Sequence, residues 1–257
     1  METSHAQRIQ SQFSKQAATF GGVIAHTAQQ SLEALVALAA PKSTDDALDI
    51  ACGPGIVTCA LAPTVRSIRG QDVVPAMLEK ARARQTERGL ANVEWDLCDA
   101  GALPYPGDRF DLVVTRFSFH HLREPLTTLR EMRRVCRVGG TIVVADVAPM
   151  PEASEHYDRF ETVRDPAHTH ALTEPEFDAL FAAANLPIAR RARHGLPMEL
   201  EGQIAASFPE PGGADELRRL FERDLGVNAL GVDARREGGQ IWFTYPVLVV
   251  ASTKTNP

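Results

Sequence analysis

The sequence predicts an α/β fold whose core is a doubly wound, mostly parallel sheet. Predicted strands and helices alternate along most of the chain, and this alternation is typical of parallel sheets. The chain has 257 residues, of which 44% are hydrophobic and 23% are charged, the composition of a globular domain. The glycine-rich turn Gly53-Pro54-Gly55 follows the first predicted strand and precedes a helix, where such sheets bind ligands.

The first strand is predicted at residues 47–51, and the apolar run at residues 56–61 opens the following helix. The glycines of the turn allow a sharp bend and let a ligand approach the backbone N–H groups. No Gly-Lys-Ser/Thr follows, which excludes a Walker A loop, and Thr58 stands where the dinucleotide-binding fingerprint has its third glycine. An ordinary strand-to-helix turn is the alternative to a ligand site.

Acidic residues close the next two strands, which are predicted at residues 67–72 and 93–97. Asp72 lies nineteen residues after the first turn glycine, and a carboxylate there can accept hydrogen bonds from both hydroxyls of a ribose. Asp99 can accept from the exocyclic amine of an adenine, while the N–H of Ala100 donates to the ring. An exposed turn aspartate is the alternative for Asp99.

The fourth strand, at residues 110–115, runs into Arg116-Phe-Ser-Phe-His-His121. Its carboxyl end should reach the crevice in which open α/β sheets bind ligands. His120 or His121 could act there as a base or contact a substrate. A helix-capping or buried core histidine is the alternative for each.

The remaining elements follow from apolar spacing and from turn residues. Met77 lies in a helix that begins at Pro75 and ends at Gly89, and it either lines a ligand slot or packs in the core. The capping box Thr173-x-x-Glu176 starts a later helix. The other predicted elements are helices at 7–20, 25–39, 125–138 (ended by Gly139-Gly140), 152–163, 203–208 and 215–225, and strands at 141–147, 187–194 and 241–250.

The chain has a formal net charge of −6, which argues against a nucleic-acid-binding surface. It shows no signal-peptide pattern near its start and no apolar run long enough to span a membrane. Its four cysteines form no Cys-x-x-Cys pair, so reduced thiols are expected. We therefore expect a cytoplasmic protein, a monomer or homodimer, with a small-molecule substrate, no nucleic-acid partner and no membrane span.

Five motifs together resemble the class I S-adenosylmethionine-dependent methyltransferases. Their order and spacing are similar to the subgroup of ubiquinone and menaquinone biosynthesis C-methyltransferases (methyltransferase type 11), over about residues 10 to 150. The motifs are Asp49-Ile-Ala-Cys-Gly-Pro-Gly55, Gln71-Asp-Val-Val-Pro-Ala-Met-Leu78, Asp99-Ala-Gly-Ala-Leu-Pro-Tyr105, Phe110-Asp-Leu-Val-Val114 with His120-His121, and Arg134-Val-Cys-Arg-Val-Gly-Gly140.

This resemblance implies a Rossmann-like sheet of seven strands in the order 3-2-1-4-5-7-6, with the last strand antiparallel. It implies one methyltransferase domain over residues 1–257, made of a helical lid (1–40), a cofactor-binding core (41–150), a substrate cap with strand six (151–235) and the last strand (236–257). The implied reaction is methyl transfer from S-adenosylmethionine to a small organic acceptor, such as an aromatic, quinone-like or secondary-metabolite molecule.

The resemblance also implies a set of site residues. Family members often carry a tyrosine in the lid, where this chain has Phe20, which keeps the ring and lacks the hydroxyl. The candidate base is His120, His121 or His168, and no metal ligands are expected. The implied cofactor-binding residues are Asp49, Ala51, Gly53, Gly55, Asp72, Val73, Met77, Asp99, Ala100, Arg116, Phe117 and Phe20.

The polar run Arg164-Asp-Pro-Ala-His-Thr-His170 lies after the fifth strand, where substrate caps are inserted in this class. Arg164, Asp165 and His168 could therefore recognise a substrate. An ion-paired loop is the alternative, and two histidines two residues apart in a loop are too little to predict a metal site.

Three other functions are alternatives to methyl transfer. A cyclase or lyase that uses the same sulfonium cofactor would carry the same binding motifs. A binding module without catalysis fits less well, because both Asp72 and Asp99 are present. A nicotinamide-dependent oxidoreductase fits less well because Thr58 replaces the third glycine.

Overall fold

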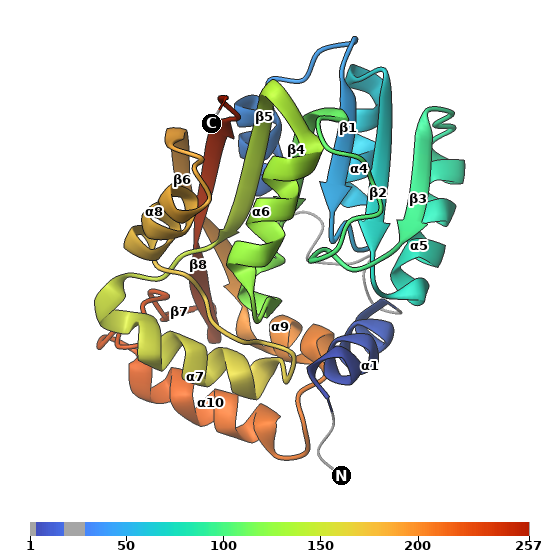
Figure 1. The fold of residues 1–257 in the computed structure, drawn as a ribbon. Coiled ribbons are helices and arrows are strands. Elements are labelled where there is room, and N and C mark those ends of the chain that lie inside the picture. Colours follow the sequence, from blue (N-terminus) through green and yellow to red (C-terminus); the bar gives the residue numbers. More distant parts are fainter. Residues whose placement is uncertain (1–3, 18–28, 257) are drawn as a thin grey trace.

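The computed structural model of the chain describes residues 4–17 and 29–256 (Figure 1). The helices are α1 (His5–Ala17), α3 (Gln29–Ala39), α4 (Ile56–Leu61), α5 (Pro75–Glu87), α6 (Pro125–Val135), α7 (Ser154–Arg164), α8 (Glu174–Ala183), α9 (Leu200–Ser207) and α10 (Gly213–Asp224). The strands are β1 (Asp46–Ile50), β2 (Ser67–Asp72), β3 (Val93–Leu97), β4 (Phe110–Arg116), β5 (Cys136–Val147), β6 (Ile188–Glu199), β7 (Arg235–Glu237) and β8 (Gln240–Thr253). Three short 3-10 helices are η1 (Ala62–Thr64), η2 (Phe119–His121) and η3 (Pro151–Ala153).

The strands form one sheet in the order β3-β2-β1-β4-β5-β8-β6, with β7 paired to β8. Strands β1 to β5 pair in parallel, and β8 lies antiparallel between β5 and β6. The predicted fold class and strand order are confirmed, with one addition. Gly238 and Gly239, both at positive φ, form a tight turn that pairs the three-residue strand β7 with the start of β8.

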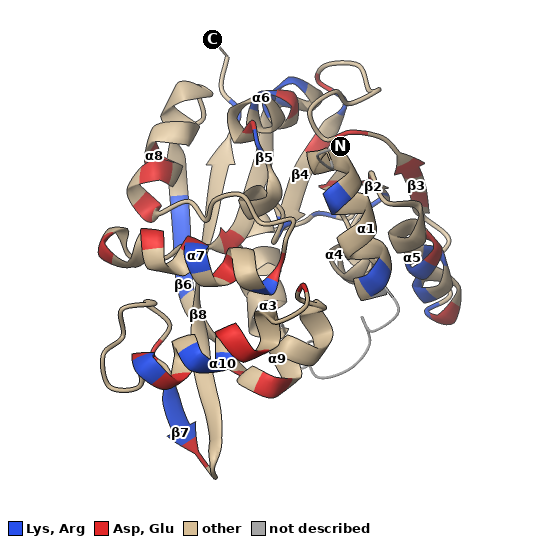
Figure 2. Ribbon diagram, turned by 90° about the horizontal axis from the view of Figure 1, so that it is seen from below, with Lys and Arg blue, Asp and Glu red and all other residues tan. Residues whose placement is uncertain are grey.

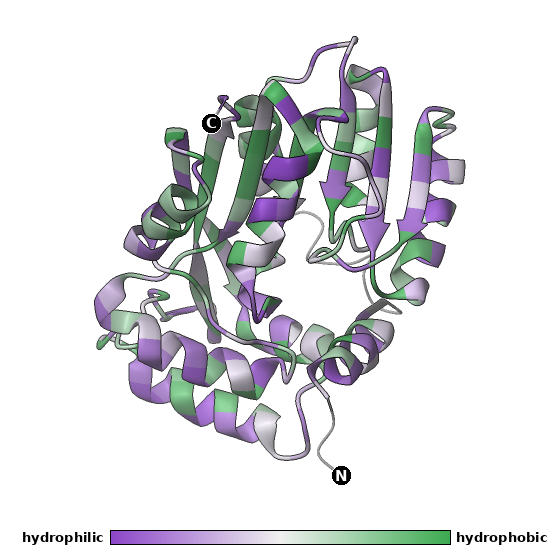
Figure 3. Ribbon diagram, viewed as in Figure 1, coloured by the Kyte–Doolittle hydropathy of each residue, from purple (hydrophilic) through white to green (hydrophobic). Residues whose placement is uncertain are grey.

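The central strands are buried on both faces, which explains their nearly continuous apolar sequences. Successive residues alternate between two clusters, because side chains of a strand point to opposite faces. Leu48, Val113 and Val144 pack in the cluster with α6 and α8. Ala47 and Val114 pack in the cluster with α3 and α4. Figure 3 shows the resulting green band along β5 and β8, with more purple on the outer helices.

The boundary between α6 and β5 differs from the prediction. Helix α6 ends at Val135, and Cys136, predicted on the apolar face of the helix, is the extended first residue of β5. The pair Gly139-Gly140 therefore lies inside a strand and caps no helix. Gly139 has a φ of +79°, and a Cβ on Gly140 would lie 2.8 Å from the carbonyl oxygen of Asp111. The glycines thus permit a bend and a close approach to β4.

Helices α7, α9 and α10 pack against the lower ends of β6 and β8 and form a cap beside the sheet (Figure 1). Aromatic rings fill the space between cap and sheet, with the Phe243 and Tyr245 rings 4.9 Å apart and the Phe160 and Phe221 rings 5.4 Å apart. The capping box predicted at Thr173 and Glu176 is confirmed at the start of α8.

Charged residues of both signs lie on the cap helices α7 and α10 (Figure 2). Arg191 and Arg193 on β6 pair with Glu174 on α8, and Arg191 also pairs with Asp178. These pairs attach α8 to the outer strand of the sheet. In the described part of the chain, no helix combines the length and the apolar character that crossing a membrane would require.

Candidate functional site

A cavity of about 460 Å³ opens at the carboxyl ends of β1, β2 and β4, where the strand order changes direction. Ligands bind at this point in open α/β sheets. The first residues of α1 and α6 complete its wall. Eleven of the predicted site residues line it: Asp49, Ala51, Gly53, Asp72, Val73, Met77, Asp99, Ala100, Arg116, Phe117 and His121.

The turn after β1 has backbone conformations that leave free space on its cavity side. Ala51 and Gly53 have φ values of +50° and +53°, a region that costs energy for a residue with a Cβ. A Cβ on Gly53 would meet no protein atom within 4 Å, so the turn leaves room on its cavity side. Strained backbone of this kind concentrates at ligand sites.

Asp72 fastens this turn to the end of β2. Its Oδ2 accepts from the N–H of Gly53 at 2.8 Å, and its Oδ1 accepts from the N–H of Val74 at 2.8 Å. Burial raises the pKa of the carboxyl, although these backbone hydrogen bonds oppose the shift. Each oxygen keeps a second lone pair, so the carboxylate can accept two further hydrogen bonds from a ligand.

Asp49 and Arg116 place an acidic and a basic group in the cavity wall. Burial raises the pKa of Asp49 to about 7, although a 2.6 Å hydrogen bond from Thr58 Oγ1 and the charge of Arg116 both lower it. Burial lowers the pKa of Arg116 to about 10, although the charge of Asp49 opposes that shift. Thr58, noted in the sequence only as a missing glycine, therefore has a role in holding the Asp49 carboxylate.

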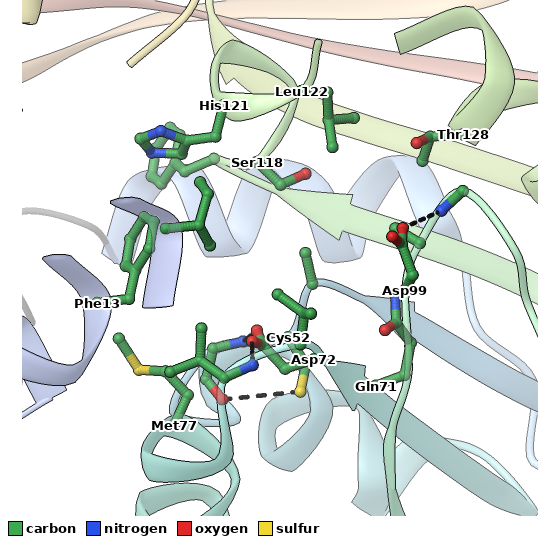
Figure 4. A pocket seen from close by; sticks show the side chains of 18 of the residues that line it. Phe13, Cys52, Gln71, Asp72, Met77, Asp99, Ser118, His121, Leu122 and Thr128 are labelled. Carbon is green, nitrogen blue, oxygen red and sulfur yellow. Dashed lines mark hydrogen bonds between the residues drawn. The ribbon is translucent and has the colours of Figure 1, made fainter. Parts of the chain in front are cut away.

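The far side of the cavity carries Asp99 and Gln71 (Figure 4). Asp99 is exposed, and its Oδ1 accepts from the N–H of Gly101 at 2.7 Å. Gln71 is 1% exposed, and its Nε2 has no hydrogen-bond partner in the structure. A buried unpaired donor is costly, so it indicates a polar ligand group at this position. Sequence reasoning missed Gln71, although its place directly before Asp72 at the end of β2 was a visible signal.

Phe13 and His121 lie together on the opposite side of the cavity (Figure 4). Their ring centroids are 4.9 Å apart, edge to face. Phe13 belongs to α1, which reaches the cavity because Phe13 and Ile9 pack on Val74 and Met77 at the start of α5. The predicted N-terminal helix is thus present and covers one side of the site, but Phe20 lies outside the described residues.

Gly55 does not line the cavity, in contrast to the other glycine of the turn. A Cβ on Gly55 would lie 2.6 Å from the ring of Trp95 and 3.0 Å from Ala81 Cβ. Its missing side chain makes room for the tryptophan beneath the turn and not for a ligand. Helix–strand packing is the physical reason for this glycine.

His120, Arg164, Asp165 and His168 also lie outside the cavity lining. Arg164 donates to Glu161 through Nε at 2.7 Å and Nη2 at 2.6 Å, and both side chains are buried. His168 Nε2 lies 2.8 Å from Asp158 Oδ1. In this structure the polar run after β5 forms a hydrogen-bonded polar cluster behind His121.

Residues 48–144 match the family of methyltransferase domains. The chain contains a methyltransferase domain. The matched segment runs from β1 to β5 and carries most residues of the cavity wall. The predicted membership in the S-adenosylmethionine-dependent methyltransferases is confirmed.

Relatives of this methyltransferase extend the match over most of the chain. An uncharacterised methyltransferase from Bacillus subtilis, YcgJ, is 29% identical over 84% of this chain and 90% of its own length. Its crystal structure superposes with a TM-score of 0.83 over 89% of this chain and all of that chain, at 22% identity. A ubiquinone/menaquinone biosynthesis C-methyltransferase from Stenotrophomonas maltophilia is 38% identical over 57% of each chain.

Proposed function

We propose that this enzyme transfers a methyl group from S-adenosylmethionine to a small, flat, uncharged organic acceptor. When bound, the cofactor supplies a methyl group activated by a sulfonium. The observation that carries the proposal is the Asp72 carboxylate, fixed by the Gly53 amide at the switch point of the sheet. The geometry of this pair suits a ribose, because two lone pairs of the carboxylate remain for its hydroxyls.

The other polar groups of the cavity fit the rest of the cofactor. Asp99 and the N–H of Ala100 would hold the adenine, and the unpaired Nε2 of Gln71 would donate beside it. The opposed charges of Asp49 and Arg116 match the ammonium and carboxylate of the methionine part. Each end of the cofactor thus has protein groups of complementary chemistry.

The acceptor would lie on the side of α1 and η2. Ile9, Phe13, Phe117 and Leu122 line this side, so a flat apolar molecule would bury well there. The similarity to a C-methyltransferase of quinone biosynthesis supports a quinone-like or phenolic acceptor. We propose that α1 serves as the lid and that the segment 151–235 caps the acceptor side.

His121 is the one of the three predicted bases that lines the cavity. We assign it the role of accepting a hydrogen bond, or the proton, of the acceptor. His120 and His168 lie behind it, outside the cavity lining, so they could affect the reaction only through other residues. We also propose a cytoplasmic location, which the free thiols of Cys52, Cys59, Cys98 and Cys136 support.

Calorimetric titration with S-adenosylmethionine tests the cofactor site. Asp72→Asn should weaken binding about 10- to 100-fold, since a hydrogen bond to a charged group contributes about 1.5–3 kcal/mol. Asp233→Asn, which changes an exposed aspartate, is the matched control. Equal affinity in wild type and Asp72→Asn would refute the ribose assignment.

Product analysis tests the reaction. The enzyme incubated with S-adenosylmethionine and neutral phenols or quinols should release S-adenosylhomocysteine and a methylated product. Conversion of an acceptor without S-adenosylhomocysteine would instead favour the cyclase or lyase alternative. Turnover of phosphorylated acceptors alone would contradict the uncharged acceptor.

A further inference from the structure

His120 and Asp146 form a buried pair behind the cavity. His120 Nδ1 lies 2.5 Å from Asp146 Oδ1, and the two residues are 7% and 1% exposed. Asp146 Oδ2 also accepts from the backbone N–H of Phe119 at 2.7 Å. The carboxylate near the end of β5 therefore fixes both the ring of His120 and the first residue of η2.

Each member of the pair shifts the pKa of the other toward its charged form. Burial alone would lower the pKa of His120, but the charge and hydrogen bond of Asp146 outweigh burial and raise it. Burial alone would raise the pKa of Asp146, but His120 outweighs burial and lowers it. Both shifts therefore favour the charged forms, an imidazolium beside a carboxylate.

His121 lies directly beside this pair. The ring centroids of His120 and His121 are 4.1 Å apart. His121 Nδ1 lies 3.1 Å from the carbonyl oxygen of Ala167, and because a carbonyl only accepts, Nδ1 must donate. In the neutral ring Nε2 is then the acceptor, and the residue lines the cavity.

We propose that the His120–Asp146 pair is a positioning device that keeps His121 neutral, with Nε2 ready to accept a proton from the substrate. This inference rests on the proposed function. A second imidazolium 4.1 Å from His120 would meet a like charge in a buried site, so the cluster holds one positive charge, on the ring beside Asp146. The substrate class follows: an acceptor whose nucleophile bears an O–H or N–H, whose proton passes to Nε2 and then to water.

The other groups around His121 are consistent with this state. His5 on α1 donates from Nε2 to the backbone carbonyl of His121 at 2.8 Å. Asp165 would favour a charged His121, but it accepts from the N–H of Ala167 and lies 3.8 Å from Arg164. The remaining facing groups are His168 beside His120 and, on α7, Glu161, which Arg164 neutralises.

The pair also explains why His121 stays neutral. Burial and the neighbouring charge of His120 both lower the pKa of His121. Such a weak base still suffices for a hydroxyl acceptor, because an oxygen that gains a methyl group becomes far more acidic. The carbonyl of Ala167 therefore fixes the tautomer of His121, and the His120–Asp146 pair disfavours protonation of its Nε2 by solvent.

Nitrogen-15 NMR of histidine side chains in the ligand-free enzyme tests the pair without reference to turnover. In wild type, His121 should be the neutral Nδ1–H tautomer from about pH 8 to well below the ordinary histidine pKa of about 6.5. His120→Gln removes the positive charge and should raise the titration midpoint of His121 by about 1–2 pH units. His156→Gln, an exposed histidine on α7, should leave it unchanged.

Asp146→Asn is the second variant, because it removes the carboxylate that holds the charge on His120. It should raise the midpoint of His121 as well, and the acidic limb of the kcat/KM profile should shift to higher pH in both variants. Affinity for S-adenosylmethionine should stay within about twofold, since neither residue lines the cavity. An ordinary titration of His121 in wild type, or one unchanged in both folded variants, would overturn the proposal. If the wild-type enzyme does not bind S-adenosylmethionine, the result would instead refute the proposed function.

Discussion

The backbone N–H of Gly53 donates a 2.8 Å hydrogen bond to the carboxylate of Asp72, which joins the turn after β1 to the end of β2. The two segments form one unit that faces the cavity. A ligand that contacts the turn and one that contacts Asp72 therefore experience the same rigid wall. Substitutions at either residue should reduce cofactor affinity more than they reduce the stability of the fold.

Gly53→Ala should weaken S-adenosylmethionine binding at least about tenfold. The new Cβ would point into space that no protein atom occupies within 4 Å, where we place the cofactor, and positive φ adds about 1–2 kcal/mol of strain. Gly89→Ala is the control: it has a φ of +62° and equally open space, but it lies at the end of α5 away from the cavity. Calorimetry should show a loss in the first variant only.

Gly70→Ala should destabilise the fold by about 1–3 kcal/mol, because its Cβ would lie 2.4 Å from Trp95 Cζ3. In most strands alanine would be the better residue. In the Trp95→Leu background, where the large ring is gone, Gly70→Ala should cost less stability than it does in wild type. Urea unfolding of the four proteins measures this coupling, and strictly additive losses would contradict the packing explanation.

Asp49→Asn should stabilise the ligand-free enzyme at pH 8 but not near pH 4. The pKa of Asp49 is raised from 3.8 to about 7, so the cost of its burial is absent below pH 4, grows between those values and is complete above pH 7. Asparagine keeps an acceptor for Thr58 without the charge. The melting temperature should rise at pH 8 by several degrees, and an equal shift at both pH values would contradict this account.

Glu161→Gln should cost about 3–5 kcal/mol, because it leaves the guanidinium of Arg164 with only the more distant carboxylate of Asp165, 3.8 Å away. Glu155→Gln, an exposed position on the same helix, should change stability by less than about 0.5 kcal/mol. The pKa of Glu161 is about 2, since Arg164 outweighs burial. Its contribution should therefore be complete above pH 4.5 and be lost as the pH falls from 4.5 to about 2.

The cofactor side of the site was accessible from sequence because its residues lie at fixed places relative to strand ends. Asp72 and Asp99 follow β2 and β3, and any parallel sheet brings those ends to one edge. The role of Gly55 was not accessible, since its neighbour Trp95 lies forty residues later in the sequence. Local patterns do not encode such contacts.

The residues on the acceptor side of the site could not be predicted from sequence alone, because tertiary contacts decide which of them reach the cavity. The sequence showed two adjacent histidines, and only the fold separates His121, which lines the cavity, from His120, which Asp146 holds behind it. Likewise the pattern around Cys136 suited a helix, but pairing with Phe110 starts the strand there. Strand pairing overrides local propensity at such boundaries.

Helix α1 has a consequence for synthesis of the chain. It is among the first segments to be made, yet its hydrogen-bond partners come much later: the carbonyl of His121 for His5, the carboxylate of Asp165 for Gln16, and the carbonyl of Ser207 for Gln12, 195 residues away. Because domains are translated from the N-terminus, α1 can pack Ile9 and Phe13 on α5 early, but its hydrogen bond to Ser207 must wait until α9 has emerged. A nascent chain that ends before Ser207 can pair β1 to β5 and so bring the strand-end carboxylates together, but it cannot complete the hydrogen bonds that hold α1 over them.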